Sequence, residues 1–200
     1  MGEININEQN ISDEKTSSSV YTEFFDCITF IFSSILFFII LFTVALRIIT
    51  VDGESMLPTL QDKNMLAVSD VGYEPQYEDV VIVYSTKLYS STTKTYGKTI
   101  VKRVIGLPGD TIRIDFGKGV VYRNGEALDE PYTHTLTNVQ ENFPNNREVT
   151  VPENRIFVLG DNRNNSKDSR SYDVGMIDMR YVVGKSLLRV WPFDQFGGVR

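Results

Sequence analysis

The chain has few of the residues from which disulfide frameworks and many metal sites are built. Its 200 residues include a single cysteine, Cys27, and a single histidine, His134. One cysteine excludes a disulfide framework and a thiolate zinc cluster, and one histidine excludes an H-E-x-x-H metal site. His134 lies in a stretch, residues 132–147, that has little strand pattern and is interpreted as a surface loop.

Basic residues are also too scattered to form a nucleic-acid-binding surface. The formal net charge is -6, and the 18 basic and 20 acidic residues that follow Arg47 nearly balance. Without a basic block there is no electrostatic basis for binding nucleic acid. The excess of acid lies near the N-terminus, where residues 1–26 hold six acids against Lys15 alone. The polar composition of residues 1–22 predicts a disordered or weakly ordered tail.

A long uncharged apolar run follows this acidic tail. Residues 27–46 read CITFIFSSILFFIILFTVAL, and 20 helical residues span about 30 Å, the thickness of the hydrocarbon core of a bilayer. The length argues against a buried core helix, and the acidic flank argues against a cleavable signal peptide. We predict a transmembrane helix over residues 27–48. The faint excess of basic residues on its C-terminal side, taken alone, would place that side in the cytoplasm.

Beyond residue 48 the sequence changes to short β-branched runs separated by turn residues, which predicts a mainly β, antiparallel domain over residues 49–200. Asn124-Gly125 predicts a two-residue hairpin turn, because both positions tolerate positive φ. The strand-like runs are NMLAVSDV, DVVIVY, TIVKRVIGL, DTIRIDF, GVVYRNGEAL, RIFVLGDN and YVVGKSLLRV.

Three segments of this domain carry reactive side chains. The first, GESMLPTL at residues 53–60, places Ser55 in a proline-containing turn directly after the apolar run. A serine in such a turn is commonly a capping residue, and it becomes a nucleophile only beside a general base.

The second segment, TIVKRVIGLPGDTIRI, places Lys102 and Arg103 inside an apolar run. Strand alternation sends one of the two toward the core, where a charged side chain is costly unless it is paired or neutral. Burial lowers the pKa of a lysine, and a neutral amine can accept a proton from serine. Solvated positions on an edge strand are the alternative. The turn at residues 106–110 should end this strand.

The third segment, FVLGDNRNNSKDSRSYDVG, is a strand followed by a dense polar loop. Such a loop is often only a self-bonded surface structure. A calcium loop is a rival by composition, but the D-x-D-x-D-G spacing is missing. Ser166 supplies a hydroxyl that could orient a lysine amine.

Together these segments resemble the bacterial type I signal peptidases, which use a Ser-Lys dyad. The resemblance covers nearly the whole chain from residue 27 onward. It is specific in G-x-S-M-x-P-T-L at residues 53–60, K-R-V-I-G-L-P-G-D at 102–110 and G-D-N-R-x-x-S-x-D-S-R at 160–170. It implies a mainly β fold of the signal peptidase type, an antiparallel catalytic domain behind a single transmembrane helix.

The resemblance also implies roles for individual residues. Ser55 would attack the scissile carbonyl, Lys102 would accept and return the proton, and Ser166 would hold the lysine amine. A supporting salt-bridge network would consist of Asp168, Arg170 and Arg103. Shallow pockets for small substrate side chains, with core packing as the alternative reading, would be lined by Val51, Met56, Leu60 and Val101.

The chain departs from part of the family where some members carry a serine two residues before the nucleophile. That position is Gly53, so stabilisation of the oxyanion must rely on the Ser55 backbone N–H and another donor. The resemblance further implies a cytoplasmic N-terminus, with residues 1–26 as its acidic tail, and an extracytoplasmic catalytic domain. We follow the resemblance on this point, because the charge bias rests on single residues.

The prediction is therefore a single-pass cell-membrane serine endopeptidase that removes signal peptides after small-x-small sites, without metal or cofactor. Its expected partners are secretory preproteins delivered by the export machinery and membrane lipid, and no nucleic acid. The substrate would add as a strand beside Lys102. The alternatives are a non-catalytic membrane-anchored assembly factor on the same fold and a self-cleaving Ser-Lys repressor, which would need a helix-turn-helix segment.

Overall fold

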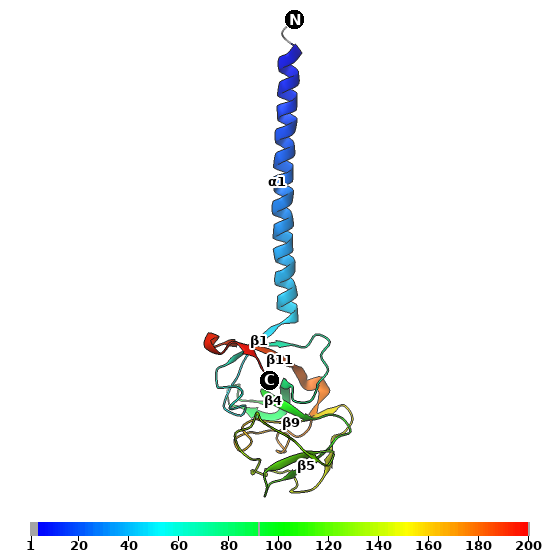
Figure 1. Cartoon of the computed structure of the whole chain (residues 1–200), viewed down its shortest axis with the longest axis vertical. Helices are drawn as coiled ribbons and strands as arrows, with labels where there is room; N and C mark the ends of the chain where they lie inside the picture. Colours follow the sequence, from blue (N-terminus) through cyan, green and yellow to red (C-terminus); the bar gives the residue numbers. More distant parts are fainter. Residues whose placement is uncertain (1–3, 92, 200) are drawn as a thin grey trace. The chain divides into compact units, whose positions relative to one another are not determined.

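The computed structural model describes residues 4–91 and 93–199, which form two compact units divided between Val44 and Ala45. The first unit is a single helix and the second is a β domain (Figure 1). Within the described residues this is the mainly β architecture, with one long helix, that the sequence predicts.

Helix α1 spans Ile4–Ala45. Its segment Tyr21–Leu41 has a mean hydropathy of 2.4 and is long and apolar enough to cross a membrane. Thr29 and Thr43 direct their hydroxyls to helix carbonyls four residues earlier, which hides these polar groups from an apolar surrounding. The predicted helix end at residue 48 was three residues too late, because Arg47 already begins a strand.

The expectation of a disordered tail over residues 1–22 was wrong for the residues that the structure describes, since α1 already begins at Ile4. Helix propagation gains a hydrogen bond for each residue it fixes, whereas nucleation is the costly step. A helix nucleated in the apolar segment can therefore extend into polar sequence that would not start a helix alone. Residues 1–3 of the predicted tail lie outside the described residues.

The larger sheet of the β domain is antiparallel and eight-stranded, in the order β1-β2-β11-β3-β4-β9-β10 with β12 paired to β11. Its central strands β3 and β4 form a long hairpin whose register pairs Val81 with Lys102 and Val80 with Arg103. The strands are β1 Arg47–Thr50, β2 Met65–Ser69, β3 Val80–Ser90, β4 Thr95–Gly106, β9 Arg155–Leu159, β10 Ile177–Asp178, β11 Val182–Trp191 and β12 Gly197–Gly198. Short 3-10 turns at Met179–Tyr181 and Phe193–Gln195 flank β11.

The smaller sheet has four strands in the order β7-β6-β5-β8. These are β5 Thr111–Asp115, β6 Val120–Arg123, β7 Glu126–Ala127 and β8 Val149–Thr150. The predicted hairpin turn joins β6 to β7, where Asn124 and Gly125 have φ of 53° and 85°. Residues 132–147 contain no strand, as predicted, and His134 is exposed there.

Three clusters of buried apolar side chains form the core of the β domain. The one that borders the site contains Val51, Met56 and Leu60 from the segment after β1, together with Ile82 of β3 and Val101 of β4. Packing of these residues fixes the loop that carries Ser55 against the strand that carries Lys102.

Candidate active site

Ser55 lies in a nucleophile loop, residues 51–60, between β1 and β2. The loop is closed at its base, where the Val51 N–H donates to the Asn64 carbonyl at 2.8 Å. Inside it, the Leu60 N–H donates to the Met56 carbonyl at 2.9 Å, and both side chains are buried. Ser55 itself is half-buried, so its hydroxyl is held by a fixed loop yet stays reachable from solvent.

Lys102 projects from β4 to this hydroxyl. Its Nζ lies 2.6 Å from Ser55 Oγ and donates a hydrogen bond to the Val101 carbonyl at 2.9 Å. Only 2% of the lysine is exposed. A serine hydroxyl within hydrogen-bond distance of a buried amine satisfies the first geometric requirement for general-base activation.

Burial lowers the pKa of Lys102 from 10.5 to about 8. The main cause is the loss of hydration of the charged amine, and the negative charges of Asp168 and then Asp161 oppose it. A lysine with an ordinary pKa would be almost entirely protonated at neutral pH. At a pKa near 8, about a tenth of the amine is neutral at pH 7 and free to accept a proton.

Both residues open into a cleft of about 470 Å³. Its walls come from the nucleophile loop, from the β3–β4 hairpin and from the polar loop after β9. One edge of β4 borders it, because β9 pairs with β4 only from Arg103 to Gly106. The lining residues are Asp52, Gly53, Glu54, Ser55, Leu88, Tyr89, Lys98, Ile100, Lys102, Glu141, Asn164, Asn165, Ser166 and Lys167.

Ser166 lies in the cleft wall but does not make the contact expected of it. Its Oγ is buried and has no hydrogen-bond partner among the described residues, so the predicted bond to the Lys102 amine is not formed. Its position depends on Gly160, because a Cβ at Gly160 would lie 2.2 Å from Ser166 Oγ and 2.5 Å from the Ser55 carbonyl oxygen. A glycine is therefore required where the polar loop meets the nucleophile loop.

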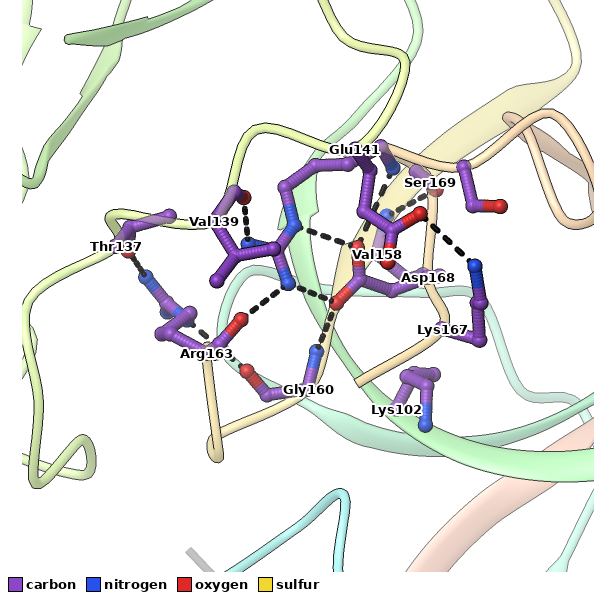
Figure 2. Close-up of polar contacts among 12 residues, drawn as sticks. Lys102, Thr137, Val139, Glu141, Val158, Gly160, Arg163, Lys167, Asp168 and Ser169 are labelled. Carbon is purple, nitrogen blue, oxygen red and sulfur yellow. Dashed lines mark hydrogen bonds and ion pairs between the residues drawn. The ribbon is translucent and has the colours of Figure 1, made fainter. Parts of the chain in front are cut away.

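The predicted support residues form two ion pairs. Asp168, labelled in Figure 2, binds Arg170 through both carboxylate oxygens at 2.8 Å. Both side chains are fully buried. Arg103, expected to join them, pairs with Asp161 instead at 2.8 and 2.6 Å. Strand alternation explains the correction, since adjacent residues of β4 point to opposite faces and Arg103 cannot follow Lys102.

Four further residues of this framework were not singled out from the sequence. Asp161 also accepts a hydrogen bond from the Thr59 hydroxyl at 2.5 Å, which ties the polar loop to the nucleophile loop. Arg163 pairs with Glu130 through two bonds of 2.7 Å. Asp161 and Arg163 stand in the G-D-N-R motif and Thr59 in P-T-L, so their signal was present, whereas Glu130 has no motif.

The predicted pocket residues do not line the cleft. Each is at most 8% exposed, and all belong to one core cluster, as the core-packing alternative requires. These residues are Val51, Met56, Leu60 and Val101. The apolar side chains that do line the cleft are Leu88, Tyr89 and Ile100.

A serine hydroxyl beside a buried lysine amine, at the edge of an open cleft, is the arrangement of a serine hydrolase with a lysine base, a variant of the serine–histidine systems. Comparison with known proteins specifies the class further. Residues 24–191 match the family described as signal peptidase, peptidase S26. The chain belongs to this family, and it is a serine peptidase that removes signal peptides.

Two relatives and one solved structure illustrate what the chain is similar to. The chain is 37% identical over 150 residues to a probable signal peptidase I-1 of Synechocystis, covering 74% of this chain and 72% of that protein. It is 36% identical over 178 residues to signal peptidase IB of Staphylococcus aureus, covering 80% and 86%. A crystal structure of a signal peptidase I from Enterococcus faecalis has 33% identity and a TM-score of 0.43, covering 56% of this chain and 97% of that one.

Proposed function

We propose that Ser55 and Lys102 are the catalytic dyad of this peptidase. Ser55 Oγ attacks the carbonyl carbon of the scissile bond while its proton passes to the neutral Lys102 Nζ. The resulting ammonium returns the proton to the leaving amine, and the acyl-enzyme ester forms. Water then attacks the ester and gives one proton to Lys102, which passes it to Ser55 Oγ as the ester bond breaks; the product leaves as a carboxylic acid that ionises in solvent. The observation that carries this proposal is the 2.6 Å separation of Oγ and Nζ.

We further propose that the substrate binds as an extended strand along the free edge of β4. Two observations support this proposal. The stretch of β4 before Arg103 has no described partner strand on the side opposite β3, and Lys98, Ile100 and Lys102 alternate along it into the cleft. An extended peptide also presents alternate side chains to one face, which suits a small-x-small recognition sequence.

We also propose that the N-terminus is cytoplasmic and that the β domain acts outside the cell membrane on preproteins delivered by the export machinery. The support is chemical: a signal peptide spans the membrane while its cleavage site emerges on the outer face. Protease treatment of spheroplasts should digest the β domain, and a fully sheltered domain would overturn this orientation.

The dyad is tested with the purified full-length chain in detergent and a peptide that contains a signal-peptide cleavage site. Wild type should cleave it, and Ser55→Ala and Lys102→Ala should each lose at least about 10³-fold in kcat, as removal of a nucleophile or its base does elsewhere. Lys118→Ala, which changes an exposed lysine in the turn between β5 and β6, is the control and should retain activity. Undiminished cleavage by both dyad variants would refute the assignment.

A further inference from the structure

Asn162 makes two hydrogen bonds to the backbone on either side of the nucleophile. Its backbone N–H donates to the Ser55 carbonyl at 3.0 Å, and its side-chain Nδ2 donates to the Glu54 carbonyl at 3.1 Å. The side chain therefore binds the carbonyl of the Glu54–Ser55 peptide group, and the Ser55 N–H belongs to the same peptide group.

The hydrogen bond from Asn162 to the Glu54 carbonyl sets the direction of the Ser55 N–H. The Glu54–Ser55 peptide is trans, so its C=O and N–H point in opposite directions. With the Glu54 oxygen directed to Asn162, the Ser55 N–H is directed away from it. No described residue accepts a hydrogen bond from this N–H, which leaves it free for a substrate oxygen.

Asn162 is itself held in place by its neighbours. The Gly160 N–H donates to Asp168 at 3.1 Å, and Arg163 Nε donates to the Gly160 carbonyl at 3.0 Å (Figure 2). Asp161 is fixed by its buried pair with Arg103. The turn at residues 160–163 thus has little freedom, and the amide of Asn162 acts on the nucleophile loop from a rigid base.

The chain offers few donors to the oxyanion, so the direction of the Ser55 N–H matters. Gly53 provides no side-chain hydroxyl to the oxyanion, and its own N–H is engaged with Asp62 Oδ1 at 2.8 Å. The Ser55 N–H is a backbone donor at the nucleophile itself, and no described residue accepts a hydrogen bond from it. Its contribution depends on direction, because an oxyanion donor must be aimed before charge develops.

We propose that Asn162 is a positioning residue that aims the Ser55 N–H at the oxyanion of the transition state. The proposal rests on the proposed role of Ser55. Loss of the Asn162 side-chain amide should only partly release the Glu54 carbonyl, because the Leu57 N–H also donates to that carbonyl at 3.1 Å. Losing an oxyanion donor outright costs about 10²- to 10³-fold in kcat, so misaiming one should cost about 10- to 100-fold.

The test uses full-length Asn162→Leu and Asn162→Asp, which keep the approximate shape of the side chain but cannot donate to the Glu54 carbonyl. Both should lower kcat about 10- to 100-fold while KM changes less than about twofold, since the interaction acts in the transition state. In the uncharged Leu variant the acidic limb of the pH–rate profile should not move. Asn142→Asp, an exposed asparagine whose side chain only accepts a hydrogen bond, is the matched control and should behave as wild type.

The outcomes separate this proposal from the proposed function. An unchanged kcat in both Asn162 variants, or a raised KM with normal kcat, would overturn the role of Asn162 while leaving the dyad intact. Cleavage by Ser55→Ala at the wild-type rate would instead refute the dyad. Melting temperatures of the variants, measured beside wild type, must be equal within about 3 °C, and a kcat loss that appears only with a lower Tm counts against the proposal.

Discussion

At the scale of single residues, the burial of Lys102 has two opposite effects. The low exposure that lowers its pKa makes the amine a usable base, and the same burial makes the charged amine costly in the folded protein. One side chain therefore links activity and stability through a single equilibrium. Both consequences can be measured by varying pH.

Activity should rise with pH through the pKa of Lys102. Because only the neutral amine accepts the serine proton, kcat/KM should increase tenfold per pH unit well below pH 8 and level off above it. A pH–rate profile of the full-length enzyme measures the limb. A limb near the ordinary lysine value of 10.5 would contradict a buried neutral base.

Stability should change in the same window. Well below pH 8 Lys102 is charged in both folded and unfolded chains, so the burial cost is fully present. The cost declines as pH rises from about 8 toward 10.5, and it is lost above 10.5, where the lysine is neutral in both states. Lys102→Met should therefore be more stable than wild type near pH 7, by an amount on the order of 3 kcal/mol, with the gap shrinking above pH 8. Urea unfolding of both proteins across pH measures it, and a constant gap would refute the linkage.

At the scale of elements, β4 places two neighbouring basic side chains, Lys102 and Arg103, on opposite faces. Lys102 faces the cleft, and Arg103 faces inward, where Asp161 neutralises it and Tyr132 lies 4.0 Å beneath its guanidinium. Asp161 lies in the turn that holds Asn162, so the strand supplies the proposed base on one face and anchors the polar loop on the other. Register errors in β4 would disrupt both functions together.

Truncation of Arg103 should destabilise the domain much more than truncation of an exposed arginine. Arg103→Ala leaves Asp161 buried without its cation, which costs about 3 to 5 kcal/mol. Arg180→Ala breaks an ion pair of similar length whose arginine is 83% exposed, and a much smaller loss of stability is expected because solvent screens the pair. Denaturant unfolding of both variants at pH 7 provides the comparison. Similar losses of unfolding free energy in the two variants would show that burial of the Arg103–Asp161 pair adds nothing to its contribution to stability.

Prediction from the sequence succeeded where local pattern decides structure. β-branched runs and the Asn124-Gly125 turn gave strands and a hairpin in the right places, because side-chain alternation and positive φ are local properties. The partner of Arg103 could not be read in this way, since Asp161 is 58 residues away and contact depends on which face each strand presents. The helical start at Ile4 was missed because polar composition says little about propagation from an existing helix.

At the scale of the whole molecule, the core of the β domain is made of residues from Val51 onward. Its buried clusters and both sheets fall within the unit Ala45–Arg200. Since folding is driven by burial of these side chains, the domain contains what it needs to fold without α1. We expect the helix to serve catalysis through location, by restricting the enzyme to the membrane surface where its substrate is proposed to lie.

Deletion of residues 1–44 should therefore separate the cleavage reaction from the step in which enzyme and membrane-embedded substrate meet. The fragment should cleave a short soluble peptide with a kcat/KM within about tenfold of the full chain, because the dyad and cleft are intact. On a preprotein embedded in liposomes it should be at least about tenfold slower than the full chain reconstituted in the same vesicles, since tethering raises the effective concentration of enzyme and substrate. Equal rates on the embedded preprotein would show that α1 does not help the enzyme to meet its substrate. Loss of peptide cleavage by a folded fragment would show that α1 is needed for the cleavage reaction itself.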